Sequence, residues 1–134
     1  MSPRFWIFVA GLLGATAVIA GAVGAHAVPR GDATFAVLGR IFDTAQLYHA
    51  LHAIALVGVA AVMAATEGKR SHWASALLHV TAFGFTLGIA MFSGGIYAQV
   101  SERFALSGWV VPAGGIAFIV GWLAFAVAAL GMRR

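Results

Sequence analysis

Four apolar runs, each long enough to cross a lipid bilayer, dominate this chain of 134 residues. A helix needs about 20 apolar residues to span roughly 30 Å of hydrocarbon. Spanning segments are helical because lipid cannot satisfy exposed backbone polar groups. Charged residues make up only 9% of the chain, against about 25% in an average soluble domain. We therefore expect an all-α integral membrane protein, a bundle of four transmembrane helices in a single domain, residues 1–134. The expected spans are residues 5–25, 45–65, 73–99 and 109–132.

Residues 33–44, which precede the second span, carry a helical pattern of their own. Pro29 is expected to end the first helix. Beyond it, Phe35, Leu38 and Phe42 recur at helical spacing, with charged side chains elsewhere on the helical wheel. We interpret residues 33–44 as a short amphipathic helix that lies in the membrane interface between the first and second spans.

The basic residues predict the orientation of the spans. Five of the eight lie at the two termini and between the second and third spans, and three lie in the other two loops. Because cytoplasmic loops carry an excess of Lys and Arg, we expect both termini in the cytoplasm and place the chain in the bacterial inner membrane. The first apolar run is too long for a typical signal-peptide core, so we interpret it as a retained span. The two groups are Arg4, Lys69, Arg70, Arg133 and Arg134 on one side, and Arg30, Arg40 and Arg103 on the other.

Seventeen glycines in so short a chain indicate close packing between helices. Small residues let transmembrane helices approach closely in lipid, where no hydrophobic driving force brings them together. The third span contains Gly84-x-x-x-Gly88, and the fourth begins with a Pro-Ala-Gly-Gly sequence at 112–115. We interpret these as packing signals, because no Walker or dinucleotide-binding pattern accompanies them. The first span carries a stripe of small residues: Ala10, Gly14, Ala17, Gly21 and Gly24.

Four stretches of the sequence are similar to a known family of small membrane proteins. The most specific pieces are the Gly-Ala-His end of the first span and the Pro-Ala-Gly-Gly to Gly-Trp-Leu pattern of the fourth. Over nearly its whole length the chain resembles the family catalogued as domain of unknown function 423, also called transmembrane-protein-256-like. The resemblance implies a four-helix membrane protein and supplies no activity, because the family is uncharacterised. The stretches are GAVGAHAV (21–28), IFDTAQLYHALHAIALVG (41–58), MFSGGIYAQ (91–99) and VVPAGGIAFIVGWLAFA (110–126).

Polar side chains gather where the first span ends, the second begins and the third ends. His49 and His52 are three residues apart and share a helix face, and His52 lies about 10 Å inside the start of its span. A polar side chain at that depth faces the bundle interior and has a partner, which for His52 we expect to be Tyr97. The sequence therefore predicts a polar pocket near the non-cytoplasmic face. Its candidate ligand-binding residues are His26, Asp43, Gln46, His49, His52 and Tyr97.

This pocket leaves three interpretations open. In the first, the histidines form hydrogen bonds between helices and stabilise the bundle. In the second, the pocket binds a ligand: His26, His49 and His52 could hold zinc or copper through their imidazole nitrogens, or the pocket could hold a haem or a quinone headgroup. In the third, it passes protons or a small solute, although no acid or base is expected near the bilayer midplane and no span is broken centrally. We interpret His79, in the third span, as an interhelical histidine outside this pocket.

The sequence favours a role without catalysis. It has no cysteine and no paired carboxylates, and its short loops leave no room for a catalytic domain, so we expect no catalytic residues. The basic residues form no patch, which argues against a nucleic-acid partner. Our working function is a small accessory, assembly or structural subunit of unknown cofactor content. Its expected partners are the lipid bilayer and either further copies of itself or a larger membrane complex.

Overall fold

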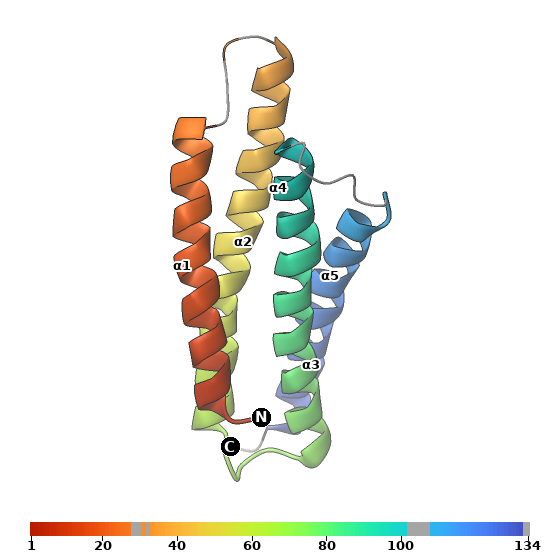
Figure 1. Ribbon diagram of the computed structural model, residues 1–134. Coiled ribbons are helices and arrows are strands. Elements are labelled where there is room, and N and C mark those ends of the chain that lie inside the picture. Colours follow the sequence, from red (N-terminus) through yellow and green to blue (C-terminus); the bar gives the residue numbers. More distant parts are fainter. Residues whose placement is uncertain (28–30, 32, 102–107, 133–134) are drawn as a thin grey trace.

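The computed structural model describes residues 1–27, 31, 33–101 and 108–132, and within these the regular secondary structure is helical (Figure 1). Pro29 and four of the basic residues counted for orientation, Arg30, Arg103, Arg133 and Arg134, lie outside the described residues. The elements are α1 (Pro3–Ala27), α2 (Ala33–Ala65), α3 (His72–Gly88), a π-turn (Ile89–Ser93), α4 (Gly94–Val100), α5 (Val110–Ala128) and a 3₁₀ turn (Ala129–Gly131).

Four helical segments of the described chain are long and apolar enough to cross a membrane, which confirms the predicted four-span bundle. Because α3, the π-turn and α4 follow one another without a break, they form a single span. The first and last helices run so that both termini lie at the same end of the molecule (Figure 1). The spans are Pro3–His26, Phe35–Ala65, His72–Val100 and Val110–Gly131.

The second span is longer than predicted and absorbs the segment expected to lie in the interface. Residues 33–44 are helical, as predicted, but they continue directly into residues 45–65 as one helix of 33 residues. No proline interrupts this stretch, so nothing forces a bend between the two parts. At 1.5 Å per residue α2 is about 50 Å long, and its first turns rise beyond the ends of α1 and α4 (Figure 1).

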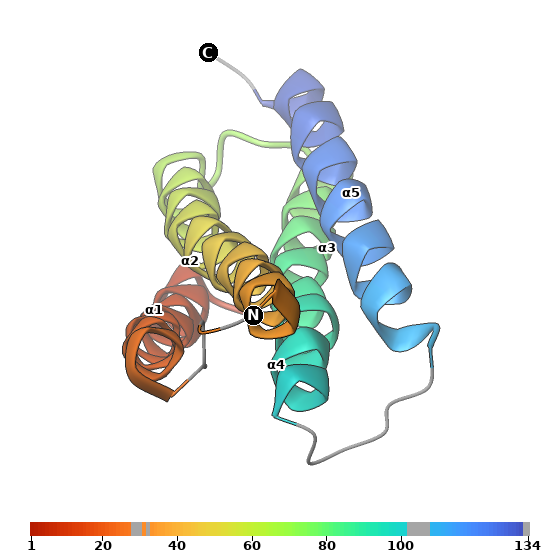
Figure 2. The ribbon, with the colours of Figure 1, turned by 90° about the horizontal axis from the view of Figure 1, so that it is seen from above.

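The helices are arranged as a row of neighbours. Viewed along the bundle, α1 and α5 lie on opposite sides, with α2 and α3 between them (Figure 2). The closest pairs are α1 with α2, and α3 with α5. Large apolar side chains cover the outside, and Val18 and Ile54 are each 73% exposed. A surface of this kind suits the hydrocarbon of a bilayer, where apolar side chains need no shielding from water.

Glycines bring α3 and α5 into contact, as the Gly84-x-x-x-Gly88 pattern predicts. A Cβ atom at Gly84 would lie 2.8 Å from the carbonyl oxygen of Ala117, and one at Gly88 would collide with the ring of Phe118. Across the interface, a Cβ at Gly121 would lie 2.8 Å from the ring of Phe85. Side chains at these positions would force the helices apart.

The small-residue stripe of the first span is only partly used for packing. Ala10, Ala17 and Gly24 are buried, and a Cβ at Gly24 would collide with the ring of Phe42 on α2. A Cβ at Gly14, in contrast, would meet no neighbouring atom within 4 Å. The stripe is therefore closely packed at Ala10, Ala17 and Gly24 and open at Gly14.

Candidate functional site

The structure divides the predicted polar residues between two depths. His49 and His52, on α2, are buried at 5% and 2% exposure, and Tyr97, on α4, is half-buried. His26, at the end of α1, and Asp43, on the first half of α2, are exposed. Gln46 lies between the two groups and points towards Gly21 of α1, within reach of a Cβ at that position. The six residues therefore do not form one pocket.

His49 is the centre of a hydrogen-bond chain that joins three helices. The Thr16 hydroxyl on α1 donates to the carbonyl oxygens of Leu12 and Leu13, each 3.0 Å away. Because its single hydrogen is used there, the Thr16 oxygen accepts from Nε2–H of His49 at 3.3 Å. The Tyr97 hydroxyl on α4 then donates to Nδ1 of His49 at 3.4 Å. Tyr97 was expected to reach His52, and it reaches His49 instead.

His52 is held by a second chain, which runs from α5 to α2. The indole N–H of Trp122 lies 3.1 Å from Nε2 of His52, and because indole can only donate, Nε2 is the acceptor. Nδ1 of His52 lies 2.8 Å from the carbonyl oxygen of Tyr48, so Nδ1 carries the proton. These partners assign a neutral imidazole with its proton on Nδ1.

Aromatic rings enclose the imidazole of His52. Phe118 of α5 stacks on it with ring centroids 3.6 Å apart and planes 17° apart. Phe85 of α3 contacts it in a T-shaped arrangement at 5.2 Å, and Tyr48 stacks at 5.8 Å. Within the described part of the chain, no buried side-chain nitrogen or oxygen lacks a hydrogen-bond partner. Both nitrogens of this ring thus have hydrogen-bond partners within the protein, and Phe118 covers one of its faces.

The two histidines lie at the middle of the membrane-spanning segments rather than near one face. Thr16, His49, His52, Phe85 and Trp122 each lie within two residues of the midpoint of their own span. The sequence predicted these histidines near one end of their span, because it placed the start of the second span at residue 45. The helix begins 12 residues earlier, at residue 33, which brings both histidines close to the midpoint of the longer segment.

The predicted metal site from His26, His49 and His52 is not assembled. Among the described residues, no group of three or more His, Cys, Asp or Glu side chains is arranged to hold a metal ion. Residues three apart on an α-helix differ by about 60° in direction. This difference turns His49 towards α1 and α4, whereas His52 faces α3 and α5. His26 is exposed at the end of α1.

Three further residues take part in the polar contacts, of which Thr16 and Trp122 are themselves exposed on the outside of the bundle. Thr16 and Trp122 had no role in the predicted pocket, because neither a lone threonine nor a tryptophan inside a span indicates a partner by itself. Ser93 is fully buried and donates to the Ala45 carbonyl oxygen at 2.8 Å. His79 is interhelical, as predicted, because it accepts a hydrogen bond of 3.1 Å from the indole of Trp6.

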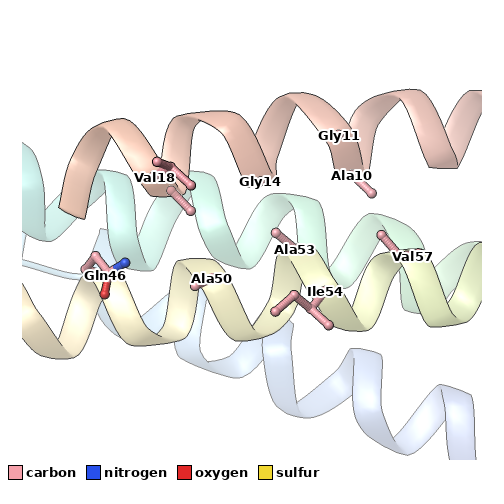
Figure 3. Close-up of a pocket in the computed structure, with 10 residues that line it drawn as sticks. Ala10, Gly11, Gly14, Val18, Gln46, Ala50, Ala53, Ile54 and Val57 are labelled. Carbon is pink, nitrogen blue, oxygen red and sulfur yellow. The ribbon is translucent and has the colours of Figure 1, made fainter. Parts of the chain in front are cut away.

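A shallow groove lies on the outside of the bundle between α1 and α2 (Figure 3). Its volume is about 370 Å³, and its lining is small and apolar, with Gly11 and Gly14 on one side and Ala50 and Ala53 on the other. The side chain of Gln46 lies at one end of it (Figure 3). The open middle of the small-residue stripe forms one wall of this groove.

The fold and the polar interior define a small α-helical membrane protein with four spans, whose central histidines form hydrogen bonds with neighbouring helices. Residues 20–115 match the family described as protein of unknown function (DUF423), and the chain belongs to this family.

Similar proteins cover almost the whole chain. The UPF0382 inner membrane protein YgdD of Escherichia coli strain K12 is 31% identical over 138 residues, which cover 100% of this chain and 95% of that protein. The UPF0382 membrane protein YwdK of Bacillus subtilis strain 168 is 31% identical over 129 residues, covering 95% and 97%. A UPF0382 membrane protein of Staphylococcus epidermidis is 30% identical over 127 residues, covering 95% and 96%. No solved structure matches the chain significantly.

Proposed function

We propose that this chain is a small accessory or structural subunit of the bacterial inner membrane, without enzymatic activity and with both termini in the cytoplasm. Its similarity to the inner membrane protein YgdD supports the location. The observation that carries the role is the environment of His52. Tyr48 and Trp122 use both ring nitrogens, and the ring of Phe118 covers one face. A metal ion or ligand would therefore have to displace contacts within the protein.

The histidines in this proposal stabilise the arrangement of helices. The His49 chain connects α1, α2 and α4, and the Trp122 bond connects α5 to α2. Hydrogen bonds of this kind contribute on average about 0.6 kcal/mol each in a membrane. The bonds contribute more to the selection of one arrangement of helices, because any arrangement that left an imidazole unpaired at the bilayer centre would be costly.

The proposal includes a partner inside the membrane, either another copy of the chain or a larger complex. Gly11 and Gly14 of α1 line the external groove, and a Cβ added at either would meet no atom of a neighbouring described residue within 4 Å. Glycine destabilises a helix interior by about 1 kcal/mol relative to alanine, and packing within this chain does not account for that cost. Close approach of a helix from outside would account for it.

The ligand-binding and transport alternatives have weaker support. Their best observation is the central depth of His49 and His52, since ionisable residues at such depth often serve function. However, both hydrogen-bond chains end on backbone carbonyl oxygens, of Leu12 and Leu13 in one and Tyr48 in the other. A carbonyl accepts a hydrogen bond without passing a proton on, so neither chain forms a relay through the membrane.

The experiment that tests the proposal compares wild-type protein with His52→Ala after purification in detergent. Metal content, the optical spectrum and the thermal midpoint are measured for both, with His72→Ala as a control for loss of an exposed histidine. A structural role predicts a lower thermal midpoint for His52→Ala and no stoichiometric metal or chromophore in either sample. A metal or cofactor that is present in the wild type and lost in His52→Ala would contradict it.

A further inference from the structure

The third span contains a π-turn between α3 and α4. The N–H of Gly94 donates to the carbonyl oxygen of Ile89, five residues earlier, where an α-helix would use a residue four earlier. A π-turn therefore holds one extra residue, and it often occurs at functional positions. Because one residue corresponds to about 100° of rotation in an α-helix, the residues that follow the π-turn face a different direction from those of an uninterrupted helix.

This extra residue decides which side chains meet α2. Phe85 contacts His52 of α2 at 5.2 Å. In an uninterrupted α-helix, the residues two and three turns further on, in line with Phe85, would be Phe92 and Ile96. The side chains that bond to α2 are instead Ser93, which donates to the Ala45 carbonyl oxygen, and Tyr97, which donates to His49. The π-turn thus brings two hydroxyls into line with Phe85, while the ring of Phe92 lies beside them and contacts Tyr48 of α2 with ring centroids 5.1 Å apart.

The π-turn is held from outside by α5. Gly114 lies directly against its backbone, and a Cβ there would collide with the amide nitrogen of Phe92 and lie 2.9 Å from the carbonyl carbon of Met91. The neighbouring Gly115 has no such constraint, because a Cβ there would meet only the ring of Phe92, at an ordinary 3.9 Å. Contact with Gly114 therefore supports the widened turn.

The residue that follows the π-turn favours rearrangement. A Cβ at Gly94 would meet only the carbonyl oxygen of Ile89, at 3.7 Å, so packing does not demand a glycine there. Glycine has more conformational freedom than any other residue and weakens a helix at its position. A π-turn and a glycine thus join segment 94–100 to the rest of its span. Both features ease a change of helical register.

We propose that the π-turn at 89–93 is a conformational switch that connects segment 94–100 to the His49 hydrogen-bond chain. In the present state, Ser93 and Tyr97 bond to α2. In the second state, the turn closes to α-helix, segment 94–100 rotates by about 100°, and Phe92 and Ile96 take the places of Ser93 and Tyr97 in line with Phe85. The Tyr97 hydroxyl then leaves His49. Packed interfaces favour such discrete alternatives over gradual deformation. The switch goes beyond the proposed subunit role and does not depend on it.

The tyrosine content of the chain allows a direct measurement. Only Tyr48 and Tyr97 are present, so Tyr48→Phe leaves a single site for 3-fluorotyrosine, at Tyr97. The Tyr48 contacts that fix His52 use its backbone carbonyl and its ring, which phenylalanine keeps. The fluorine NMR signal of Tyr97 then reports whether its hydroxyl is bonded to His49.

A deletion provides the reference for the bonded state. Ala90 is exposed within the π-turn, and removing it leaves Ser93 and Tyr97 in line with Phe85 on a plain α-helix. The deletion variant should therefore hold Tyr97 on His49 and give one resonance. The undeleted protein should give a second resonance, which Gly114→Ala increases and the matched control Gly115→Ala does not. A single sharp resonance at the position of the deletion variant, unmoved by Gly114→Ala, would overturn the proposal.

A cross-linking experiment decides the question if the deletion variant does not fold. The chain has no cysteine, so two pairs can be made cleanly: Ala45→Cys with Ser93→Cys, and Ala45→Cys with Phe92→Cys. The switch predicts that both pairs form a disulfide on oxidation in membranes, and that Gly114→Ala increases the yield of the Phe92→Cys pair. A disulfide in the Ser93→Cys pair alone, with and without Gly114→Ala, would mean that the π-turn is static.

Discussion

The indole nitrogen of Trp122 lies 3.1 Å from Nε2 of His52, and this hydrogen bond joins α5 to α2 at the centre of the bundle. The backbone of α5 packs chiefly on α3, and that of α2 on α1 and α3, so α2 and α5 meet mainly through side chains. Because tryptophan only donates, the bond requires an imidazole that accepts. The pair therefore keeps His52 neutral, and a neutral ring is the form that costs least at this depth.

The first prediction concerns this bond. Trp122→Phe keeps an aromatic ring and removes the donor, so Nε2 of His52 is left without its partner. We expect the free energy of unfolding in detergent to fall by about 0.6 to 1.7 kcal/mol, the range of measured interhelical hydrogen bonds. Trp109→Phe is the control, because Trp109 is 65% exposed at the start of α5. Equal effects of the two changes would show that ring size, and not the bond, determines the loss.

The second prediction concerns the protons on the two central histidines. The donors and acceptors assign the proton to Nδ1 in His52 and to Nε2 in His49. Nitrogen NMR of histidine-labelled protein should therefore show one neutral ring of each tautomer at the bundle centre. His49→Gln and His52→Gln assign the two signals. Two rings of the same tautomer would contradict one of the two hydrogen-bond chains.

The sequence was sufficient for the fold but not for the polar interior. Span length and composition predict the four helices because bilayer thickness sets a simple requirement that any apolar run of about 20 residues meets. The same reasoning identified His49 and His52 as buried, since a polar side chain inside a span faces its neighbours. Gly84 and Gly88 were also predictable, because few other reasons place glycines four apart in a transmembrane helix.

The wrong predictions concern the direction in which a side chain points, which its position in the sequence does not give. Hydropathy does not locate the start of a helix to within a few residues, and the early start of α2 moved the histidines from one face to the middle. The partner of Tyr97 depends on the π-turn, which rotates the end of the third span by one residue. No pattern of hydrophobicity predicts such an insertion. Likewise, the role of Trp122 as a hydrogen-bond donor to His52 follows only from the position of α5 beside α2.

The third prediction concerns glycine packing. Gly84→Ala places a Cβ 2.8 Å from the Ala117 carbonyl oxygen, an approach to backbone that only movement of α3 or α5 can relieve. Overpacking of this kind costs about 1 to 3 kcal/mol, and we expect a loss of that size in the free energy of unfolding. Gly58→Ala is the matched control, because a Cβ at Gly58 meets nothing within 4 Å. There the better helix propensity of alanine should give no loss and up to about 1 kcal/mol of gain.

The fourth prediction concerns orientation, which the absence of cysteine makes simple to measure. Ser2→Cys and Glu67→Cys place a thiol at the end of the bundle that carries both termini, whereas Gly31→Cys and Gly108→Cys place one at the opposite end. All four positions are exposed.

The excess of Lys and Arg around the termini predicts that the end of the bundle with both termini faces the cytoplasm. A membrane-impermeant maleimide should therefore label Gly31→Cys and Gly108→Cys in intact cells, and Ser2→Cys and Glu67→Cys only after permeabilisation. The reverse pattern would invert the orientation, and labelling of Ser2→Cys and Gly31→Cys from the same side would contradict the first span itself.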